Sequence, residues 1–233
     1  MRGVFVTGTD TGVGKTLFCA ALLLQLGAAG IRAAACKPVS AGCRRVGARL
    51  VNADAELLAR FAPVRTPLEV LNPVALEPAV APHIAAAEAG VSLDAASLVA
   101  AARTASAGAE FLVVEGAGGW RVPLGETGSL ADVAVGLGLP VVLVVGLRLG
   151  CLNHALLSAE AIRADGLALA GWVANPLPPE MPRLEENIAT LVRRLGAPLA
   201  RLPACGAATE EARVRQAAAA PLLLHGITAF TYD

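Results

Sequence analysis

Nine residues near the N-terminus have the types and order of a phosphate-binding loop. Residues 8–16 read GTDTGVGKT and follow the apolar run at residues 4–6. Between a strand and a helix, such a loop binds phosphate oxygens through backbone N–H groups, and its glycines let the backbone come close. Lys15 can then reach the β- and γ-phosphates, and the hydroxyl of Thr16 can coordinate Mg²⁺. The usual pattern has glycine where Thr9 stands, so a glycine turn opening an ordinary buried helix is the alternative.

Lysine usage points to a second residue with a specific task. The chain has 19 basic residues, and all are arginine except Lys15 and Lys37. A compact ammonium cannot be exchanged for a guanidinium where it must fit among phosphate oxygens. Lys37 directly follows a predicted strand at residues 31–36, and groups just beyond the carboxyl ends of parallel strands line the ligand crevice. We therefore expect Lys37 beside the phosphate loop, with chance survival of the lysine as the alternative.

Two carboxylates are candidates for the same crevice. Residues 111–115, FLVVE, predict a buried strand that ends in Glu115, and a glycine-rich turn follows. In phosphate-loop proteins an acid in this position commonly helps to hold Mg²⁺, whereas an ordinary strand-to-turn transition is the alternative. Asp54 lies in the first turn of a predicted helix at residues 52–61. It is either a partner of the helix dipole or a metal ligand, if the loop brings it to the site.

A predicted helix start could bind a different anion. The buried strand expected at residues 140–146 leads to a helix that we expect to begin at Asn153-His154 and to end near residue 163. The free N–H groups at such an end can bind a carboxylate. Capping of the helix by the Asn153 side chain is the structural alternative.

Apolar strands recur along the chain with helical stretches between them. We expect further helices at residues 17–26, 83–89, 94–105, 183–195 and 209–219, and further strands at 168–174 and 198–202. Residues 63–82 contain five prolines and predict irregular structure, and the cluster Arg44, Arg45 and Arg49 predicts a solvated loop. The pattern predicts a single α/β domain over residues 1–233, similar to the P-loop NTPases, with a mostly parallel sheet covered by helices on both faces.

Composition argues against several classes of partner. The formal net charge is zero and aromatic residues make up 3% of the 233 residues, so a nucleic-acid-binding surface is not expected. No apolar run is long enough for a membrane span, and the phosphate loop begins too early for a signal peptide. The five cysteines are scattered, which predicts free thiols in a reducing compartment. We expect a cytoplasmic protein that acts on small molecules.

Taken together, the motifs resemble those of the dethiobiotin synthetases, the ATP-dependent carboxylases of biotin synthesis. The resemblance extends to about Pro203. It rests on FVTGTDTGVGKT at residues 5–16, CKPVSAG at 36–42, NADAELLAR at 52–60, APHIAAAEAG at 81–90, VEGAGGW at 114–120, VVLVVGLRLGCLNHALLSAE at 141–160 and GWVAN at 171–175.

This resemblance implies a three-step reaction that uses ATP and Mg²⁺. An amine of 7,8-diaminopelargonic acid captures CO₂ as a carbamate, and the γ-phosphoryl group of ATP is transferred to a carbamate oxygen. The second amine then attacks the carbonyl carbon, expels phosphate and closes a cyclic urea, dethiobiotin. Such chemistry needs positioning and charge neutralisation more than a covalent nucleophile.

The resemblance also implies roles for individual residues and an assembly. Thr11, Lys15 and Lys37 would act in catalysis, with Lys37 stabilising the carbamate and Thr11 contacting the reacting end. The Gly150–Asn153 turn would hold the substrate carboxylate across a homodimer interface. The implied nucleotide contacts are Gly12, Val13, Gly14, Lys15, Thr16, Leu17, Asn175 at the adenine edge, and Pro203. The implied substrate contacts are Ser40, Ala41, Glu115, Gly118, Gly150, Cys151 and Asn153, and the implied Mg²⁺ ligands are Thr16, Asp54 and Glu115.

Two positions depart from the family pattern, and two other protein classes compete with it. Some relatives have an acid at the position of Gly12, and a hydroxyl residue is usual where Ala41 stands. A cobyrinate synthase-like amide-forming enzyme would need an amidotransferase part, for which this chain has no room. A switch ATPase of the partitioning or septum-positioning type usually has an early lysine in its phosphate loop, where this chain has Thr9-Asp10-Thr11.

Overall fold

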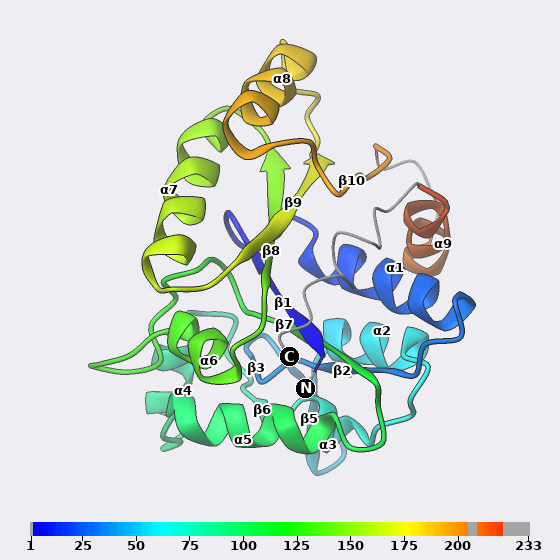
Figure 1. Ribbon diagram of the computed structural model, residues 1–233. Coiled ribbons are helices and arrows are strands. Elements are labelled where there is room, and N and C mark those ends of the chain that lie inside the picture. The colour runs from blue at the N-terminus through cyan, green and yellow to red at the C-terminus, as the bar shows by residue number, and fades with distance from the viewer. Residues whose placement is uncertain (1, 205–208, 221–233) are drawn as a thin grey trace.

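A six-stranded parallel sheet forms the centre of the computed structural model, which describes residues 2–204 and 209–220 (Figure 1). The strand order is β10-β9-β8-β1-β7-β2. Their bounds are β1 (Gly3–Gly8), β2 (Ala33–Cys36), β7 (Phe111–Glu115), β8 (Val141–Leu147), β9 (Leu169–Pro176) and β10 (Ala200–Arg201). Two small sheets lie outside it: β3 (Val39–Ser40) pairs with β6 (Val74–Ala75), and β4 (Arg44–Val46) pairs with β5 (Arg49–Val51). The predicted α/β class is confirmed.

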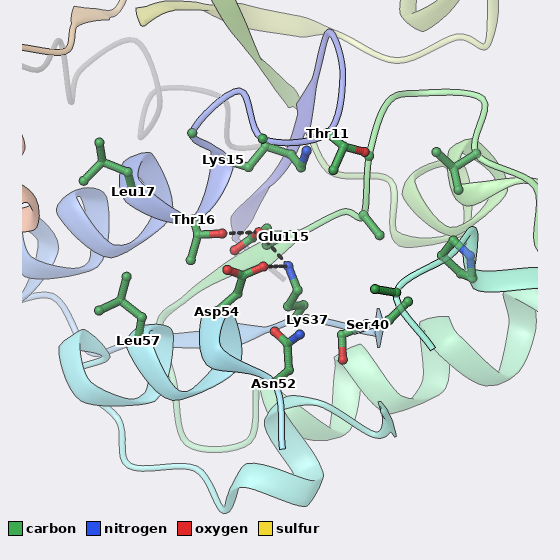
Figure 2. Close-up of a pocket in the computed structure, with 18 of the residues that line it drawn as sticks. Thr11, Lys15, Thr16, Leu17, Lys37, Ser40, Asn52, Asp54, Leu57 and Glu115 are labelled. Atoms are coloured by element: carbon green, nitrogen blue, oxygen red, sulfur yellow. Dashed lines mark hydrogen bonds and ion pairs between the residues drawn. The ribbon is translucent and has the colours of Figure 1, made fainter. Parts of the chain in front are cut away.

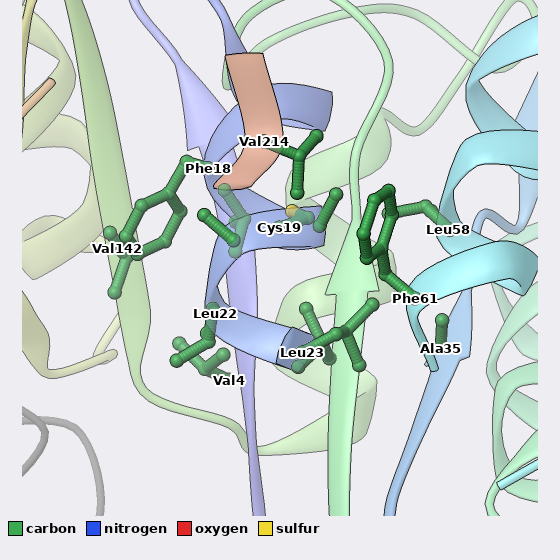
Figure 3. Close-up of a cluster of buried hydrophobic side chains, with 14 of the residues drawn as sticks. Val4, Phe18, Cys19, Leu22, Leu23, Ala35, Leu58, Phe61, Val142 and Val214 are labelled. Carbon is green, nitrogen blue, oxygen red and sulfur yellow. The ribbon is translucent and has the colours of Figure 1, made fainter. Parts of the chain in front are cut away.

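Helices cover both faces of the sheet. The helices are α1 (Lys15–Ala28), α2 (Ala53–Phe61), α3 (Leu68–Leu71), α4 (Pro82–Glu88), α5 (Ala95–Ala105), α6 (Leu130–Leu137), α7 (Cys151–Ala164), α8 (Leu184–Leu195) and α9 (Glu210–Ala219). Helices α1, α2 and α9 share one buried apolar cluster, in which Phe18 and Leu22 of α1 are fully buried (Figure 3). Helices α5 to α8 contribute to clusters on the opposite face of the sheet.

Side chains that alternate in direction along each strand contribute to the apolar clusters on both faces of the sheet. In β8, Val142 and Val144 belong to the cluster under α1, whereas Leu143 and Val145 belong to the cluster under α7 and α8. Successive side chains of a strand point to opposite faces, so a strand buried on both sides must be apolar throughout. This requirement accounts for the unbroken apolar run in β8, which the sequence showed.

The sheet register brings the predicted site residues to one edge. In the pairing of β2 with β7, Cys36 lies opposite Val114, so Lys37 and Glu115 follow as the next residue on each strand. In the pairing of β1 with β8, Gly8 lies opposite Val144, and Gly146 of β8 lies opposite Asn175 of β9. The carboxyl ends of β1, β2, β7 and β9 therefore meet at the phosphate loop.

Several predicted elements need correction. Helix α7 begins at Cys151 and not at Asn153, because Gly150 caps it in a left-handed conformation at φ 96°. Residues 63–82, expected to be irregular, contain α3 and β6. The arginine cluster is exposed as expected, but it forms the β4–β5 hairpin and not a loop. Helix α6 was not predicted, although the Asp132 carboxylate accepts a 2.6 Å hydrogen bond from the Ser129 N–H at its start.

The described cysteines are free thiols, as predicted. Cys19, Cys36, Cys43 and Cys151 are all buried, whereas Cys205 lies outside the described residues. Burial raises the pKa of Cys36 to about 12 and holds the pKa of Cys19 well above its ordinary value. These two thiols are therefore protonated and unreactive at neutral pH. Within residues 2–204 and 209–220, no helix is long and apolar enough to cross a membrane.

Candidate active site

The phosphate loop connects β1 to α1 and exposes backbone N–H groups at the start of the helix. Gly12 and Gly14 have φ angles of 72° and 95°, in the left-handed region that favours glycine. Asn175 supports the loop, because its Nδ2 donates a 2.7 Å hydrogen bond to the Val13 carbonyl. A Cβ atom at position 14 would lie 2.2 Å from that same Nδ2. Glycine at position 14 is thus required by both backbone conformation and space.

Lys15 lies over this loop with its charge directed toward the loop's interior. Its Nζ donates a 2.9 Å hydrogen bond to the Asp10 carbonyl, and its side chain is largely buried. Burial lowers the pKa of Lys15, and the nearby positive charge of Lys37 acts in the same direction, whereas Glu115 opposes them. The Lys15 ammonium and the free N–H groups at the start of α1 both attract anions.

A hydrogen-bonded cluster of four side chains lies at the floor of the site (Figure 2). Glu115 Oε1 accepts from Thr16 Oγ1 at 2.7 Å and from Lys37 Nζ at 2.7 Å. Lys37 Nζ also lies 2.9 Å from Asp54 Oδ2. The four residues come from the ends of β7 and β2 and from the starts of α1 and α2. The expectation that Lys37 and Asp54 reach the phosphate loop is therefore met by the geometry.

Opposite charges decide the protonation states in this cluster. Burial by itself would lower the pKa of Lys37, but the carboxylates of Glu115 and Asp54 outweigh it and raise that pKa above the ordinary value. Burial acts on Asp54 in the reverse sense, and the charge of Lys37 outweighs it and lowers the pKa of Asp54. Lys37 is consequently a fixed cation and Asp54 a fixed anion at neutral pH.

One oxygen in the cluster lacks a partner. Glu115 is 1% exposed, and its Oε2 has no hydrogen-bond partner among the described residues. Buried carboxylate oxygens are ordinarily hydrogen-bonded or bound to a cation. The described residues hold no cluster of three or more His, Cys, Asp and Glu side chains arranged for a metal. The donor set of two carboxylates and one hydroxyl nevertheless suits Mg²⁺, which takes few protein ligands and completes its shell with phosphate and water.

A cavity of about 780 Å³ opens above this cluster. The loop after β7 forms one wall, where a Cβ atom at Gly118 would lie 3.4 Å from Thr11 Oγ1. The predicted residues that line the cavity are Thr11, Gly12, Gly14, Lys15, Thr16, Leu17, Lys37, Ser40, Ala41, Asp54, Glu115 and Gly118. The cavity therefore combines phosphate-binding groups, a buried cation and carboxylates in one space.

Six predicted site residues lie outside the cavity lining. Val13 belongs to the loop, but its side chain is buried. Pro203 follows the edge strand β10. Gly150, Cys151 and Asn153 lie at the start of α7, and the backbone of Asn153 is already helical. Asn175 is also outside the lining, because its amide is hydrogen-bonded to the loop from behind.

Comparison with known proteins decides the family. A family model described as an AAA domain matches residues 2–212. The ATP-dependent dethiobiotin synthetase BioD of Pseudomonas paraeruginosa is 58% identical over 205 residues, which cover 87% of this chain and 90% of the relative. The BioD protein of Cellvibrio japonicus is 50% identical over 223 residues, which cover 95% of this chain and 98% of the relative. The chain belongs to the dethiobiotin synthetase family.

Solved structures confirm the fold of this dethiobiotin synthetase family member. The septum site-determining protein MinD of Pyrococcus horikoshii has a TM-score of 0.55 at 18% identity, covering 98% of this chain and 87% of MinD. A ParA family ATPase of Chlorobium tepidum has a TM-score of 0.52 at 13% identity, and the match covers 99% of this chain and 94% of the ATPase. Partitioning and septum-positioning ATPases thus share the fold, and sequence identity separates the family from them.

The structure adds a dethiobiotin synthetase residue that the sequence did not single out. Asn72 Nδ2 donates to the Lys37 carbonyl at 2.7 Å, and Asn72 Oδ1 accepts from Ser40 Oγ at 2.8 Å. Asn72 is buried and therefore fixes the segment between Lys37 and Ala41. The Asn72-Pro73 dipeptide marks only a turn in the sequence. Ser40 is 1% exposed, and its hydroxyl donates its proton to Asn72.

Residues of α9 also line the cavity without having been predicted. Glu210 and Arg213 face the same space as Leu17 of α1. Helix α9 packs along α1, where Val214 and Ala217 are fully buried. Only this long-range packing identifies them, because the acidic first turn of α9 looks like an ordinary helix start in the sequence.

Proposed function

We propose that this chain converts 7,8-diaminopelargonic acid, CO₂ and ATP into dethiobiotin, ADP and phosphate. The observation that carries the proposal is the buried cluster of Lys37, Glu115 and Asp54 against the phosphate loop, in a chain 58% identical to an ATP-dependent dethiobiotin synthetase. We propose that residues 1–233 act as a single domain. A cytoplasmic location is proposed as well, and the four free, buried thiols support it.

The phosphate loop would hold the triphosphate. Backbone N–H groups at the start of α1 would receive the phosphates, with Gly12 and Gly14 leaving room for them. Lys15 would exchange the Asp10 carbonyl for a phosphate oxygen, which compensates its charge better than a neutral carbonyl. Leu17 and Pro203 are proposed to border the nucleoside. Asn175 is proposed to meet the adenine edge while its Nδ2 supports Val13.

Lys37 would act on the carbamate. The substrate amine forms a C–N bond to CO₂ and loses a proton, giving a carbamate anion in the cavity beside the Lys37 ammonium. A carbamate oxygen then attacks the γ-phosphorus as the bond to ADP breaks. Lys37 stays charged through this sequence, because its carboxylate partners raise its pKa. It can therefore neutralise first the carbamate and then the transferred phosphoryl group.

Ring closure would follow within the same cavity. The second amine attacks the carbonyl carbon of the carbamic-phosphoric anhydride, the C–O bond to phosphate breaks, and a proton leaves the nitrogen. Thr11 and Gly118 lie close together at the wall of the cavity, so they are proposed to border the reacting end of the substrate. Ser40, Ala41 and the loop after β7 are proposed to border the rest of the diamine.

Mg²⁺ would be held by Thr16, Asp54 and Glu115, and the unpartnered Oε2 of Glu115 supports this assignment. When bound, the ion neutralises charge on the β- and γ-phosphate oxygens. The residues themselves provide a hydroxyl and two carboxylates, and Lys37 lies between the carboxylates and holds them in place.

A homodimer would complete the site. Gly150, Cys151 and Asn153 lie outside the cavity of their own chain, so their proposed contact with the substrate carboxylate is made to the partner subunit's substrate. Exposed apolar side chains near and along α7 support this assembly, with Leu149 94% and Leu157 56% exposed. A sedimentation mass of about twice the 23.5 kDa chain is expected.

An oxygen-isotope experiment tests the proposed intermediate. Fresh C¹⁸O₂ is mixed with the enzyme, the diamine and Mg-ATP, and the inorganic phosphate is analysed by mass spectrometry. Because a carbamate oxygen leaves with the phosphoryl group, we expect one ¹⁸O atom in each labelled phosphate. Dethiobiotin formed together with unlabelled phosphate would contradict the anhydride.

A further inference from the structure

An ion pair joins the phosphate loop to the turn that precedes α7. Arg148 Nη2 pairs with Asp10 Oδ2, and both side chains are about half exposed, at 49% and 45%. The two residues belong to loops that follow the neighbouring parallel strands β8 and β1. Neither belongs to the described lining of the active-site cavity. Exposed ion pairs of this kind stabilise a fold little, so the position of the pair matters more than its energy.

On one side, Asp10 is bound to the reactive part of the phosphate loop. Its Oδ1 accepts a 2.7 Å hydrogen bond from the Thr11 N–H, and its carbonyl accepts a 2.9 Å hydrogen bond from Lys15 Nζ. The oxygens of Asp10 thus contact Thr11, Lys15 and Arg148. The carbonyl that Lys15 contacts and the carboxylate that Arg148 contacts thus belong to one loop residue.

On the other side, Arg148 is bound to the start of α7. Its carbonyl accepts a 3.0 Å hydrogen bond from the Cys151 N–H, which closes the turn that Gly150 makes at φ 96°. The strand before it is also fixed to the phosphate loop, because the Gly146 N–H donates to Thr9 Oγ1 at 3.3 Å. A shift of Arg148 therefore moves the N–H groups at the start of α7.

We propose that Asp10 and Arg148 are positioning residues that couple nucleotide occupancy of the phosphate loop to substrate binding at the start of α7. This inference rests on the proposed function, in which the Gly150–Asn153 turn holds the substrate carboxylate. When Lys15 turns from the Asp10 carbonyl to a phosphate, Asp10 loses one of its three contacts and its hold on Arg148 changes. In the proposed homodimer the turn serves the partner's cavity, so the coupling runs from one subunit's nucleotide to the other subunit's diamine.

Calorimetric titration of the full-length protein tests this coupling. The dissociation constant of diaminopelargonate is measured with and without a Mg²⁺-bound, non-hydrolysable ATP analogue, and the ratio is the coupling. The variants are Asp10→Asn, which keeps an acceptor for the Thr11 N–H, Arg148→Gln, and Arg148→Lys as a charge-conserving rescue. Glu186→Gln is the matched control, because it removes the carboxylate of another exposed ion pair, with Arg183 at the start of α8.

The expected ratio in the wild type is at least about fivefold, the lower end of ordinary allosteric coupling. In Asp10→Asn and Arg148→Gln it falls below about twofold while each ligand alone still binds within about threefold of wild type. Arg148→Lys recovers part of the ratio, and Glu186→Gln keeps all of it. A full ratio in Asp10→Asn and Arg148→Gln, or no coupling in the wild type, overturns the inference and leaves the proposed function standing. Failure of the wild type to bind the diamine overturns both.

Discussion

At the scale of single residues, the central feature of the site is a lysine between two carboxylates. Lys37 is 4% exposed, and its Nζ lies within 2.9 Å of both Glu115 and Asp54. The rarity of lysine in the sequence indicated that this ammonium has a task that arginine cannot perform. The structure gives the physical reason, since a larger planar guanidinium cannot enter this space without displacing a carboxylate.

Lys37→Arg is therefore expected to reduce kcat by at least about 100-fold, the loss typical of removing one well-placed electrostatic group. The fold should persist, because the variant keeps a positive charge to pair with a carboxylate of the cluster. Steady-state kinetics measures the first effect, and thermal unfolding measures the second. Arg44→Lys, on the exposed hairpin, is the reverse exchange and serves as a control. Near-normal turnover in Lys37→Arg would remove the lysine from the mechanism.

Glu115→Gln tests the metal assignment. The change keeps the size of the side chain but removes its negative charge and replaces one of its two carboxylate oxygens, of which Oε2 has no partner, by an NH₂ group. We expect the Mg²⁺ concentration for half-maximal activity to rise at least about tenfold, equivalent to about 1.4 kcal/mol. The control is Glu110→Gln, just before β7, whose carboxylate accepts from the Arg32 N–H outside the site. An unchanged Mg²⁺ requirement in Glu115→Gln would contradict the assignment.

The pKa of Asp54 predicts a specific pH effect on stability. Burial would raise this pKa, but Lys37 outweighs it, so the folded-state pKa lies below the reference value of 3.8. A depressed carboxyl pKa stabilises the fold above the unfolded-state value, and this stabilisation is lost as pH falls through the folded-state pKa. The difference in unfolding free energy between wild type and Asp54→Asn should therefore shrink from about pH 6 to about pH 3. Urea unfolding measures it, and a difference that is constant with pH would show that Lys37 does not hold Asp54.

At the scale of elements, two glycines of the phosphate loop differ in what surrounds them. Both have positive φ angles, but a Cβ atom at Gly12 would meet nothing within 4 Å, whereas one at Gly14 would meet Asn175 Nδ2 at 2.2 Å. The acid that some relatives have at position 12 therefore fits without steric conflict. The loop requires glycine more strictly at position 14, where β9 supports it.

Gly12→Ala is expected to cost about 1 kcal/mol of unfolding free energy, the strain of a non-glycine residue in the left-handed region. Gly14→Ala should cost at least about twice as much, because Asn175 must also give up its hydrogen bond to the Val13 carbonyl. Chemical denaturation of the two variants gives the comparison. Equal losses would mean that Asn175 does not brace the loop.

The elements that the sequence predicted well are those determined by local pattern. Strands β7 and β8 are continuous apolar runs, and the phosphate loop has a recognisable spacing of glycine, lysine and threonine. The start of α7 was misplaced because a left-handed glycine, Gly150, caps it instead of a polar side chain. Strands β3 and β6, two residues each, exist only because distant segments pair, and no periodicity can reveal such short pieces.

At the scale of the whole molecule, the site is assembled from segments far apart in the chain. Residues 16, 37, 54 and 115 meet because two strands end and two helices begin at one edge of a parallel sheet. The sequence could predict these residues because each lies at or next to the start or end of a predicted element. It could not predict Asn72, Glu210 or Arg213, whose place in the site depends on packing between distant segments.

The fold alone does not identify the activity, because the MinD and ParA family proteins of known structure share it. Identity of 50–58% to dethiobiotin synthetases does identify the family. Incubation with diaminopelargonate, Mg-ATP and ¹³C-bicarbonate, followed by mass spectrometry, tests this conclusion most directly. We expect a cyclic urea carrying one ¹³C atom, formed in equal amount with ADP. ADP released at the same rate with and without the diamine, and no labelled urea, would contradict it.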